Sequence, residues 1–366
     1  MNRRIPGARR RIRKSSAVTS EQAEESARSL VRRDQDGEAN HEFGQSVRKA
    51  FSLADYFVDA TSDPRKEIER LVRLFFADPE QSPTRDEYAM FSASAAALRS
   101  ADMSRQVGAT ISGADGEIVT SGCNEVPKPG GGIYWTNDVP DGRDFKLGSD
   151  PNALIGHEIL HEIFVRLKDA GWLAKEYIDG DLRDLVEQAR ERDLFGDARV
   201  ANLIEFGRVV HAEMNAILAA ARTGTSIGGK MLYCTTFPCH VCARHIIGAG
   251  IAEVVYIEPY PKSLALRLYP EAISFEAEES SPKVRFRPFT GVAPRRYQEF
   301  FGFGRRKDAR GFAVKWSPSA ARPRVRQLGN PHLLAEVGLR DRVTDALRAR
   351  DWIQAGSHHE DREDPT

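Results

Sequence analysis

The alternation of apolar and polar positions along the chain predicts an α/β protein. Short apolar runs rich in β-branched and aromatic residues predict strands at 107–111, 117–120, 231–236, 253–257 and 284–289. The first two runs flank Ala114-Asp115-Gly116, and an Asp-Gly step between two strands favours a β-hairpin. The last run alternates as an edge strand does.

Apolar residues at helical spacing predict helices between these strands, at 46–58, 68–76, 86–99, about 157–170, 182–191 and 263–268. Two further helices begin at His211 and at Pro238. Proline suits a first helical turn because the missing N–H has no partner there anyway. Gly248 or Gly250 can end the second of these helices.

Shifts in composition divide the chain into segments. We expect a disordered basic and polar tail, a helical segment, a main domain with an insertion that begins at Pro129-Gly130-Gly131-Gly132, a C-terminal extension and a second polar tail. The ranges are 1–45, 46–84, 85–290 with the insertion at about 128–207, 291–349 and 350–366. The arginine-rich start could touch RNA or another anion, but such charge runs are typical of solvated tails.

Charge and hydropathy narrow the functional classes. Lys plus Arg (53) equals Asp plus Glu (53), so the net charge is zero and argues against a dedicated nucleic-acid surface. Neither a stretch of the ~20 apolar residues that span a bilayer nor the apolar core of a secretory signal is present. We therefore expect a cytoplasmic protein that does not bind or cross a membrane.

Two motifs carry candidate metal chemistry. His211-Ala212-Glu213 is followed by Pro238-Cys239-His240-Val241-Cys242. One His and two Cys can hold a tetrahedral zinc and leave a fourth position for water, so His211, Cys239 and Cys242 are the expected ligands. Of the four cysteines, Cys123 and Cys234 remain, and we expect free thiols.

The spacing of these motifs indicates a reaction. Each begins a helix, whose positive end favours thiolate over thiol. Glu213 lies beside a ligand without being needed as one, so it can relay protons for a zinc-activated water. The pattern is that of the zinc nucleobase deaminases. A structural zinc, or a chance pairing of a core His with C-x-x-C, is the alternative; the Glu spacing, Pro238, the preceding strand and the two helix starts together favour the deaminase.

Two other motifs are rejected. His157-Glu158-Ile159-Leu160-His161 matches the H-E-x-x-H of zinc proteases, but no third ligand follows, so we expect an ordinary helix of the insertion. A second, structural metal there is the alternative. Residues 224–231 nearly match a phosphate-binding P-loop, but Met231 replaces the Ser/Thr and the order is helix, loop, strand. We expect the turn that ends the helix begun at His211.

With these residues in view, the chain resembles the deoxycytidylate deaminase branch of the cytidine deaminase superfamily. The matching pieces are 104–109, 122–127, 211–217 and 234–242. Segments 257–263 and 288–295 and the long insertion are similar to those of bacterial anti-phage dCTP deaminases. The resemblance implies a three-layer α/β/α fold with a mixed five-stranded sheet.

The resemblance also implies substrate contacts. Asn124 would meet the sugar hydroxyl, although an Asn that only stabilises its own turn is the alternative. Phe237 could line the base pocket or could be a core aromatic. Lys262 and the arginines at 295–306 are candidates for phosphate contact, with solvated surface charge as the alternative.

The anti-phage group carries an N-terminal P-loop domain, whereas residues 44–58 resemble only the end of one. We therefore expect a truncated or split member, with a separately encoded P-loop protein as a partner, and a homo-oligomer. The predicted activity is hydrolytic deamination of dCMP or dCTP to dUMP or dUTP plus ammonia, in nucleotide depletion during antiviral defence. The alternatives are a deaminase of bases in RNA or DNA and a non-catalytic, zinc-stapled interaction protein.

Overall fold

The computed structural model describes residues 51–348, apart from 62, 193, 196–197, 199, 201–202, 277–281, 303 and 325–330, together with residues 26 and 29. Apart from those two isolated residues, the tails expected at 1–45 and 350–366 lie outside the described residues. The resemblance of residues 44–58 to the end of a P-loop domain also falls partly outside them.

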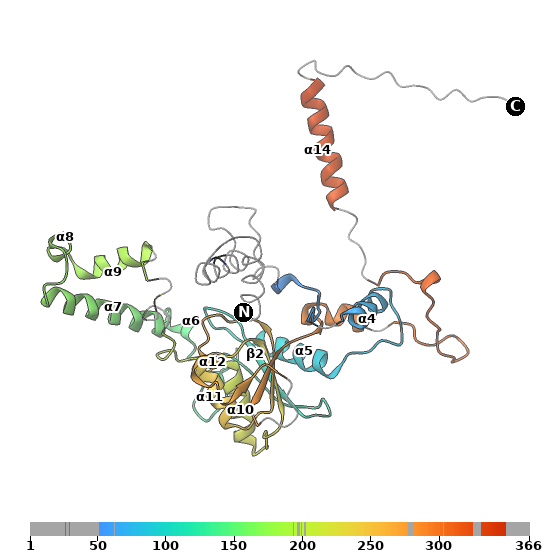
Figure 1. Ribbon diagram of the computed structural model, residues 1–366, viewed down its shortest axis with the longest axis horizontal. Helices are drawn as coiled ribbons and strands as arrows, with labels where there is room; N and C mark the ends of the chain where they lie inside the picture. The colour runs from blue at the N-terminus through green and yellow to red at the C-terminus, as the bar shows by residue number, and fades with distance from the viewer. Residues whose placement is uncertain are drawn as a thin grey trace, which may run out of the picture.

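One mixed sheet forms the centre of the molecule (Figure 1). Its strands are β2 (Gly108–Ser112), β3 (Ile118–Cys123), β4 (Met231–Thr236), β5 (Glu253–Glu258), β6 (Ile273–Ser274) and β7 (Val284–Pro288), in the order β3-β2-β4-β5-β7-β6. β2 is antiparallel to both of its neighbours, and β4, β5, β7 and β6 are parallel. The hairpin predicted around Asp115-Gly116 is confirmed.

Two expectations about the sheet are wrong. It has six strands rather than five, because Ile273 and Ser274 add a two-residue strand that is too short to produce an alternating pattern. This strand pairs with β7, so β7 is not at the edge. The alternation of β7 has another source: Val284 and Phe286 enter the core, whereas Arg285 and Arg287 pair with Glu253 on the neighbouring strand.

Helices cover both faces of the sheet, which confirms the three-layer α/β/α fold. Along β4, Leu232 and Cys234 join the core cluster formed with α10 (Ala212–Thr223) and α11 (His240–Gly248). Tyr233, between them, packs with α5 (Arg85–Ala97). Because neighbouring side chains of a strand point to opposite faces, α5 lies on one side and α10 and α11 lie on the other.

Two glycines allow these helices to lie directly on the strands. A Cβ at Gly108 would be 1.9 Å from the carbonyl oxygen of Ala93 in α5, and one at Gly122 would be 2.5 Å from the amide nitrogen of Ala216 in α10. A side chain at either position would push the helix off the sheet. The N-terminus of α10, where the candidate site begins, is therefore fixed against the strand β3.

The segments on either side of the main domain meet each other. β1 (Tyr56–Phe57) pairs antiparallel with β8 (Gly291–Val292), so the helix predicted for 46–58 is wrong at these residues. Leu74 of α4 (Arg65–Phe75) is buried with Val292 and Phe300. The remaining C-terminal elements are η2 (Pro294–Arg296), α13 (Tyr297–Phe301), η3 (Pro318–Ala320) and α14 (Pro331–Arg348).

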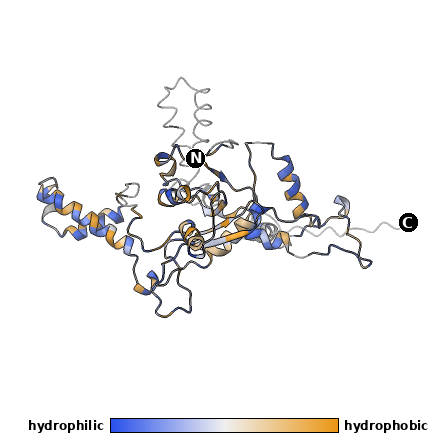
Figure 2. Ribbon diagram, turned by 90° about the horizontal axis from the view of Figure 1, so that it is seen from below, coloured by the Kyte–Doolittle hydropathy of each residue, from blue (hydrophilic) through white to orange (hydrophobic). Residues whose placement is uncertain are grey.

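The insertion forms a helical arm that extends away from the sheet (Figure 1). Its helices are α6 (Asp144–Leu147), α7 (Pro151–Asp169), α8 (Lys175–Ile178) and α9 (Leu182–Glu191), and α12 (Ala265–Leu268) completes the main domain. α7 and α9 bury Leu160, Leu182, Val186 and Ala189. Apolar and polar residues alternate over the arm (Figure 2). Among the described helices, none has the length and apolar character needed to cross a membrane.

Candidate active site

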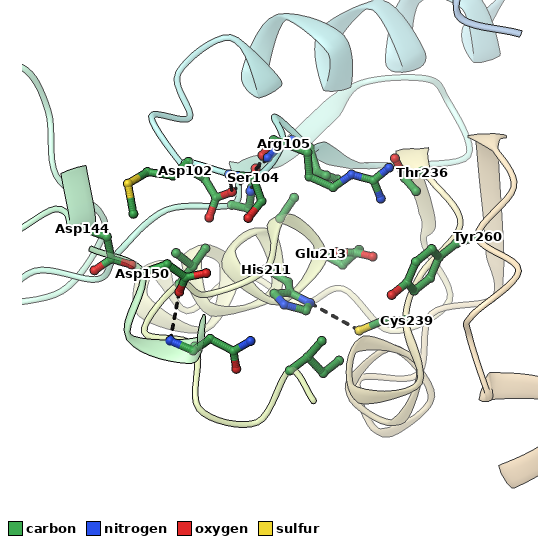
Figure 3. Close-up of a pocket in the computed structure, with 18 of the residues that line it drawn as sticks. Asp102, Ser104, Arg105, Asp144, Asp150, His211, Glu213, Thr236, Cys239 and Tyr260 are labelled. Carbon is green, nitrogen blue, oxygen red and sulfur yellow. Dashed lines mark hydrogen bonds between the residues drawn. The ribbon is translucent and has the colours of Figure 1, made fainter. Parts of the chain in front are cut away.

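The three expected metal ligands come together, although they come from different elements. His211 is the N-cap of α10 and Cys239 is the N-cap of α11, with Cys242 in the first turn of that helix. The Nδ1 atom of His211 lies 3.3 Å from the Sγ atom of Cys239 (Figure 3) and 3.3 Å from that of Cys242. Pro238 precedes the N-cap, so its prediction in the first helical turn is wrong by two positions.

The geometry of these donors fits a metal ion. Zinc bonds of ~2.3 Å to sulfur and ~2.0 Å to nitrogen in a tetrahedron separate the two donor types by roughly 3.5 Å. The observed separations are 3.3 Å. The hydrogen bond from Cys242 lowers the pKa of Cys239 to about 4, and the resulting thiolate raises the pKa of His211 to about 8. Two sulfurs and one nitrogen form the donor set that zinc prefers.

Glu213 lies beside these donors and is buried, with 4% of its surface exposed. The thiol of Cys242 donates to its Oε2 atom at 3.4 Å. Burial, followed by the negative charge of Cys239, raises the pKa of Glu213. The carboxyl group therefore lies next to the three donors in an environment that favours proton uptake.

His211 and Cys239 line a cavity of about 240 Å³. Its walls come from three parts of the chain: the loop 102–107, the ends of the sheet strands with the helix starts, and the insertion. The lining residues include Asp102, Arg105, Asn124, Asp144, Asp150, Asn152, Ile204, His211, Glu213, Thr236, Phe237, Cys239 and Tyr260. Arg105, Thr236 and Tyr260 lie in segments that carry the resemblance, but the sequence assigned no role to them or to the insertion residues.

Asn124 lines the cavity and also secures its wall. Its Oδ1 accepts from the backbone N–H of Val107 at 2.7 Å, and its Nδ2 donates to the carbonyl of Arg105 at 2.8 Å. These bonds match the alternative in which the amide stabilises the backbone. One amide hydrogen and one lone pair are left over, so the sugar contact stays a prediction.

Phe237 belongs both to the core and to the cavity. Its ring lies 4.9 Å from that of Tyr256 and 5.4 Å from that of Phe286, and 9% of the residue is exposed. The structure therefore places it in the apolar cluster with one edge in the cavity wall. Its contact with a base stays a prediction.

The other candidate residues lie elsewhere. Arg295 and Arg296 pair with Asp55, and neither they nor Lys262 line the cavity. His157 faces Glu187 at 3.3 Å, and within the described part of the chain His211, Cys239 and Cys242 are the one group of three donors close enough to share an ion. Residues 224–230 lead from the C-terminus of α10 into β4, as expected of a helix-ending turn.

Part of the chain is similar to known deaminases. Residues 83–258 match the family model described as the cytidine and deoxycytidylate deaminase zinc-binding region. The deoxycytidylate deaminase of Enterobacteria phage T2 is 52% identical over 54 residues, which are 15% of this chain and 29% of the relative. The human deoxycytidylate deaminase is 45% identical over 49 residues, 13% of this chain and 26% of the relative. Thus the matches span less than a third of these relatives.

Solved structures were also compared. A dCMP deaminase from the cyanophage S-TIM5, in complex with dCMP and dUMP, is 19% identical with a TM-score of 0.31 over 57% of this chain and 100% of that one. The apo form of the same protein gives a TM-score of 0.29.

The three-layer fold, the His-Cys-Cys group and the matched region define a zinc-binding domain of the cytidine deaminase class. Within that class, the curated relatives that are similar to this chain are deoxycytidylate deaminases. The matched region is a zinc-binding one, and His211, Cys239 and Cys242 are the described residues that fit zinc.

Proposed function

We propose that the protein hydrolyses the 4-amino group of a deoxycytidine nucleotide, converting dCMP or dCTP to the deoxyuridine nucleotide and ammonia. The observation that carries the proposal is a buried carboxyl group, Glu213, that lines the same cavity as His211 and Cys239, two of the three donors able to hold zinc. The curated relatives that match this chain are deoxycytidylate deaminases, which supports a deoxycytidine nucleotide over other substrates.

The chemistry divides between the metal and the chain. When bound, zinc lowers the pKa of a water in the site toward neutrality and so supplies a nucleophile. Glu213 takes one proton from this water as the water adds to C4 of cytosine, and gives that proton to N3. It then takes the proton of the new C4 hydroxyl as the carbonyl forms and passes it to the amino nitrogen, and ammonia leaves with the electrons of the C4–N bond. The raised pKa of Glu213 suits a group that must both accept and donate a proton.

The surroundings of the cavity support binding of a whole nucleotide. Phe237 offers an apolar edge to a base, and Asn124 retains a free hydrogen and a lone pair for a hydroxyl. The curated relatives that match the chain are deoxycytidylate deaminases, which supports the nucleotide deaminase over the alternative that acts on RNA or DNA.

The test is the variant Glu213→Gln in zinc-loaded protein, assayed with dCMP, dCTP, deoxycytidine and cytidine for uracil product. Replacing the carboxylate removes the proton relay, and we expect turnover to fall by about 100-fold or more. Zinc content should not change, because Glu213 is not one of the three donors. Wild-type protein that deaminates single-stranded DNA or RNA but none of these nucleotides would overturn the proposal, and so would a fully active Glu213→Gln.

We also propose that this activity depletes deoxycytidine nucleotides during phage infection, in the cytoplasm. The likeness of segments 257–263 and 288–295 to the anti-phage deaminases supports this role. Phage plating on cells that carry the wild-type or the Glu213→Gln gene tests it: protection by both would contradict it. The homo-oligomer and the P-loop partner stay predictions, to be tested by native mass spectrometry.

A further inference from the structure

A strongly basic segment lies at residues 304–324. It contains seven arginines and lysines and one aspartate, so its net charge is +6 in a chain whose net charge is zero. The balanced total therefore conceals a local excess of positive charge, and such an excess attracts an anionic partner. In Figure 1 the segment follows α13 and lies beyond α4, at the end of the molecule opposite the helical arm.

The middle of this basic segment is a turn that its own hydrogen bonds hold in place. Lys307 forms an antiparallel bridge with Ala313. The backbone N–H groups of Arg310 and Phe312 each donate to Asp308 at 2.9 Å. The single acid of the segment thus closes the turn, and the side chains around it start from a defined backbone.

After the turn, the basic segment is attached to the end of α4. The indole N–H of Trp316 donates to the carbonyl of Phe76 at 3.0 Å, and the backbone N–H of Arg324 donates to that of Phe75 at 2.8 Å. Apart from Asp308 and Val314, residues 305–315 are exposed. The turn is therefore a projection on a fixed base and not a part of the hydrophobic core.

The exposed cations of the turn lack a close carboxylate partner. Four of them form no ion pair among the described residues: Arg305, Arg306, Lys307 and Lys315. Arg310 meets Asp308 at 3.5 Å, which is too long for a charge-assisted hydrogen bond. Like charges gathered on one turn repel each other, and a polyanion that neutralises several of them relieves this repulsion.

Phe312 gives the turn a property that charge alone does not provide. The residue is 66% exposed, and the guanidinium of Arg310 lies 5.7 Å from the centre of its ring. An exposed ring among cations can stack on an unpaired base while the cations contact the phosphates on either side. A duplex hides the faces of its bases, and a single phenyl ring offers little apolar area to a bilayer. The arrangement therefore fits a single strand best.

We propose that residues 304–324 form a binding surface for single-stranded nucleic acid. The residues of this segment do not line the cavity beside His211. The strand is thus a partner on which the protein docks, and it is distinct from the nucleotide that is deaminated in the cavity. The inference does not depend on the proposed hydrolysis.

The first test measures the fluorescence anisotropy of labelled DNA and RNA strands of mixed sequence with the full chain. The charge variant is Arg306→Ala/Lys307→Ala/Arg310→Ala. The matched control removes three exposed positive charges elsewhere and is Arg183→Ala/Arg190→Ala/Arg244→Ala. Each phosphate contact to a single strand contributes ~0.7 to the slope of log K against log salt concentration, so we expect the charge variant to lose about 2 from this slope. The control should bind as wild type does.

The second test separates stacking from charge. Phe312→Ala removes the ring and keeps every cation, and we expect single strands to bind roughly 5- to 100-fold more weakly, because stacking on one base is lost. The salt slope should not change, and binding of a DNA duplex should be the same in Phe312→Ala and wild type. Binding of either DNA or RNA supports the inference, and the ratio of the two affinities identifies the preferred strand.

The arginine-rich residues 3–14 remain in every protein, so ultraviolet cross-linking to a thymine-containing strand and peptide mass spectrometry locate the contact. We expect cross-links in the peptide that contains Phe312. Cross-links confined to residues 3–14, or equal affinities of the charge variant and its control, would overturn the inference. So would binding to vesicles of phosphatidylserine and phosphatidylcholine without binding to either strand, which would make the segment a membrane surface.

Discussion

At the scale of single residues, the four cysteines fall into two pairs: Cys239 and Cys242 face His211, whereas Cys123 and Cys234 do not. Cys239 and Cys242 each lie 3.3 Å from the imidazole, whereas Cys123 is buried in the sheet, where burial raises the pKa of its thiol to about 11. Neutral, buried thiols are poor ligands.

We therefore expect Cys239→Ala to lose its zinc and Cys123→Ala to keep it. The control removes the same sulfur atom from a buried position, so it separates loss of a ligand from loss of packing. The measurement is the number of zinc ions per chain in each purified variant, determined by elemental mass spectrometry. A full equivalent of zinc in Cys239→Ala would exclude that residue from the ligand set.

The metal-ligand motifs could be recognised from sequence because each is local. His211 and Glu213 are two positions apart, and Cys239 and Cys242 are three apart, so spacing alone relates the members of each pair. Arg105 and Tyr260 reach the same cavity from loops that are far apart in the chain. Each lies in a segment that resembles known deaminases, but no spacing relates the two residues, and only the folded structure brings them together.

At the scale of elements, contact between strand and helix depends on positions without a side chain. A Cβ at Gly108 would lie 1.9 Å from the carbonyl oxygen of Ala93, which belongs to a helix that cannot bend locally. We expect Gly108→Ala to reduce the free energy of unfolding by about 2–3 kcal/mol through overpacking. Chemical denaturation measures this change.

The matched control for that experiment is Gly248→Ala at the end of α11. Nothing lies within 4 Å of a Cβ built there, so the substitution should be neutral or stabilising by up to about 1 kcal/mol. If Gly108→Ala were no less stable than Gly248→Ala, α5 would not be packed on β2 as described.

A second element-scale prediction concerns Glu87, whose side chain is fully buried. It accepts from both terminal nitrogens of Arg70 at 2.7 and 2.8 Å and from the N–H of Val292 at 2.8 Å, and so joins α4, α5 and β8. Arg70→Ala leaves this carboxylate without its cation, and we expect a loss of about 3 kcal/mol in unfolding free energy.

Arg65→Ala provides the comparison for Arg70→Ala, because Arg65 and its partner Asp63 are 90% and 68% exposed at 3.7 Å. Exposed pairs contribute at most ~1 kcal/mol, so this variant should unfold almost as wild type does. If the two variants had denaturation curves with the same midpoint, the Arg70–Glu87 pair would contribute no more to the free energy of unfolding than the exposed Arg65–Asp63 pair.

Strands and helices with a continuous pattern were predictable, whereas those that depend on a distant partner were not. β4 occurs at the expected residues, 231–236, since it is a bounded apolar run. β1 is a strand because Tyr56 pairs with Val292, and β6 is one because Ile273 pairs with Val284. α7 begins at Pro151, earlier than its apolar pattern, because Asp150 caps it.

At the scale of the whole molecule, the cavity is where three distant parts of the chain meet. The loop 102–107 forms one wall, the starts of α10 and α11 supply His211, Glu213 and Cys239, and the insertion supplies Asp144, Asp150 and Asn152. The insertion is thus part of the wall, although most of its length forms the projecting arm in Figure 1. Its sequence gave no sign of this, since Asp150 and Asn152 occur there as an ordinary helix start.

Because the donors come from separate parts of the chain, zinc should stabilise the folded state. The three donors belong to the starts of two helices that pack on one face of the sheet, and they meet only in the folded chain. A ligand that binds only the folded state stabilises it by about 2.7 kcal/mol at a free concentration 100 times its Kd. For a domain of this size, that corresponds to a rise in Tm of roughly 5–10 °C.

We therefore expect chelation to lower the Tm by this amount without abolishing cooperative unfolding, because most of the buried core, such as Leu232, Val254 and Phe286, belongs to strands and not to metal ligands. Calorimetry over a range of buffered free zinc measures the effect, with magnesium as the control ion. Cys239→Ala should not respond to zinc, and Cys123→Ala should respond as wild type does. A Tm of the wild type that is independent of zinc would mean that the donors do not share an ion in solution, and the proposed hydrolysis would lose its source of activated water.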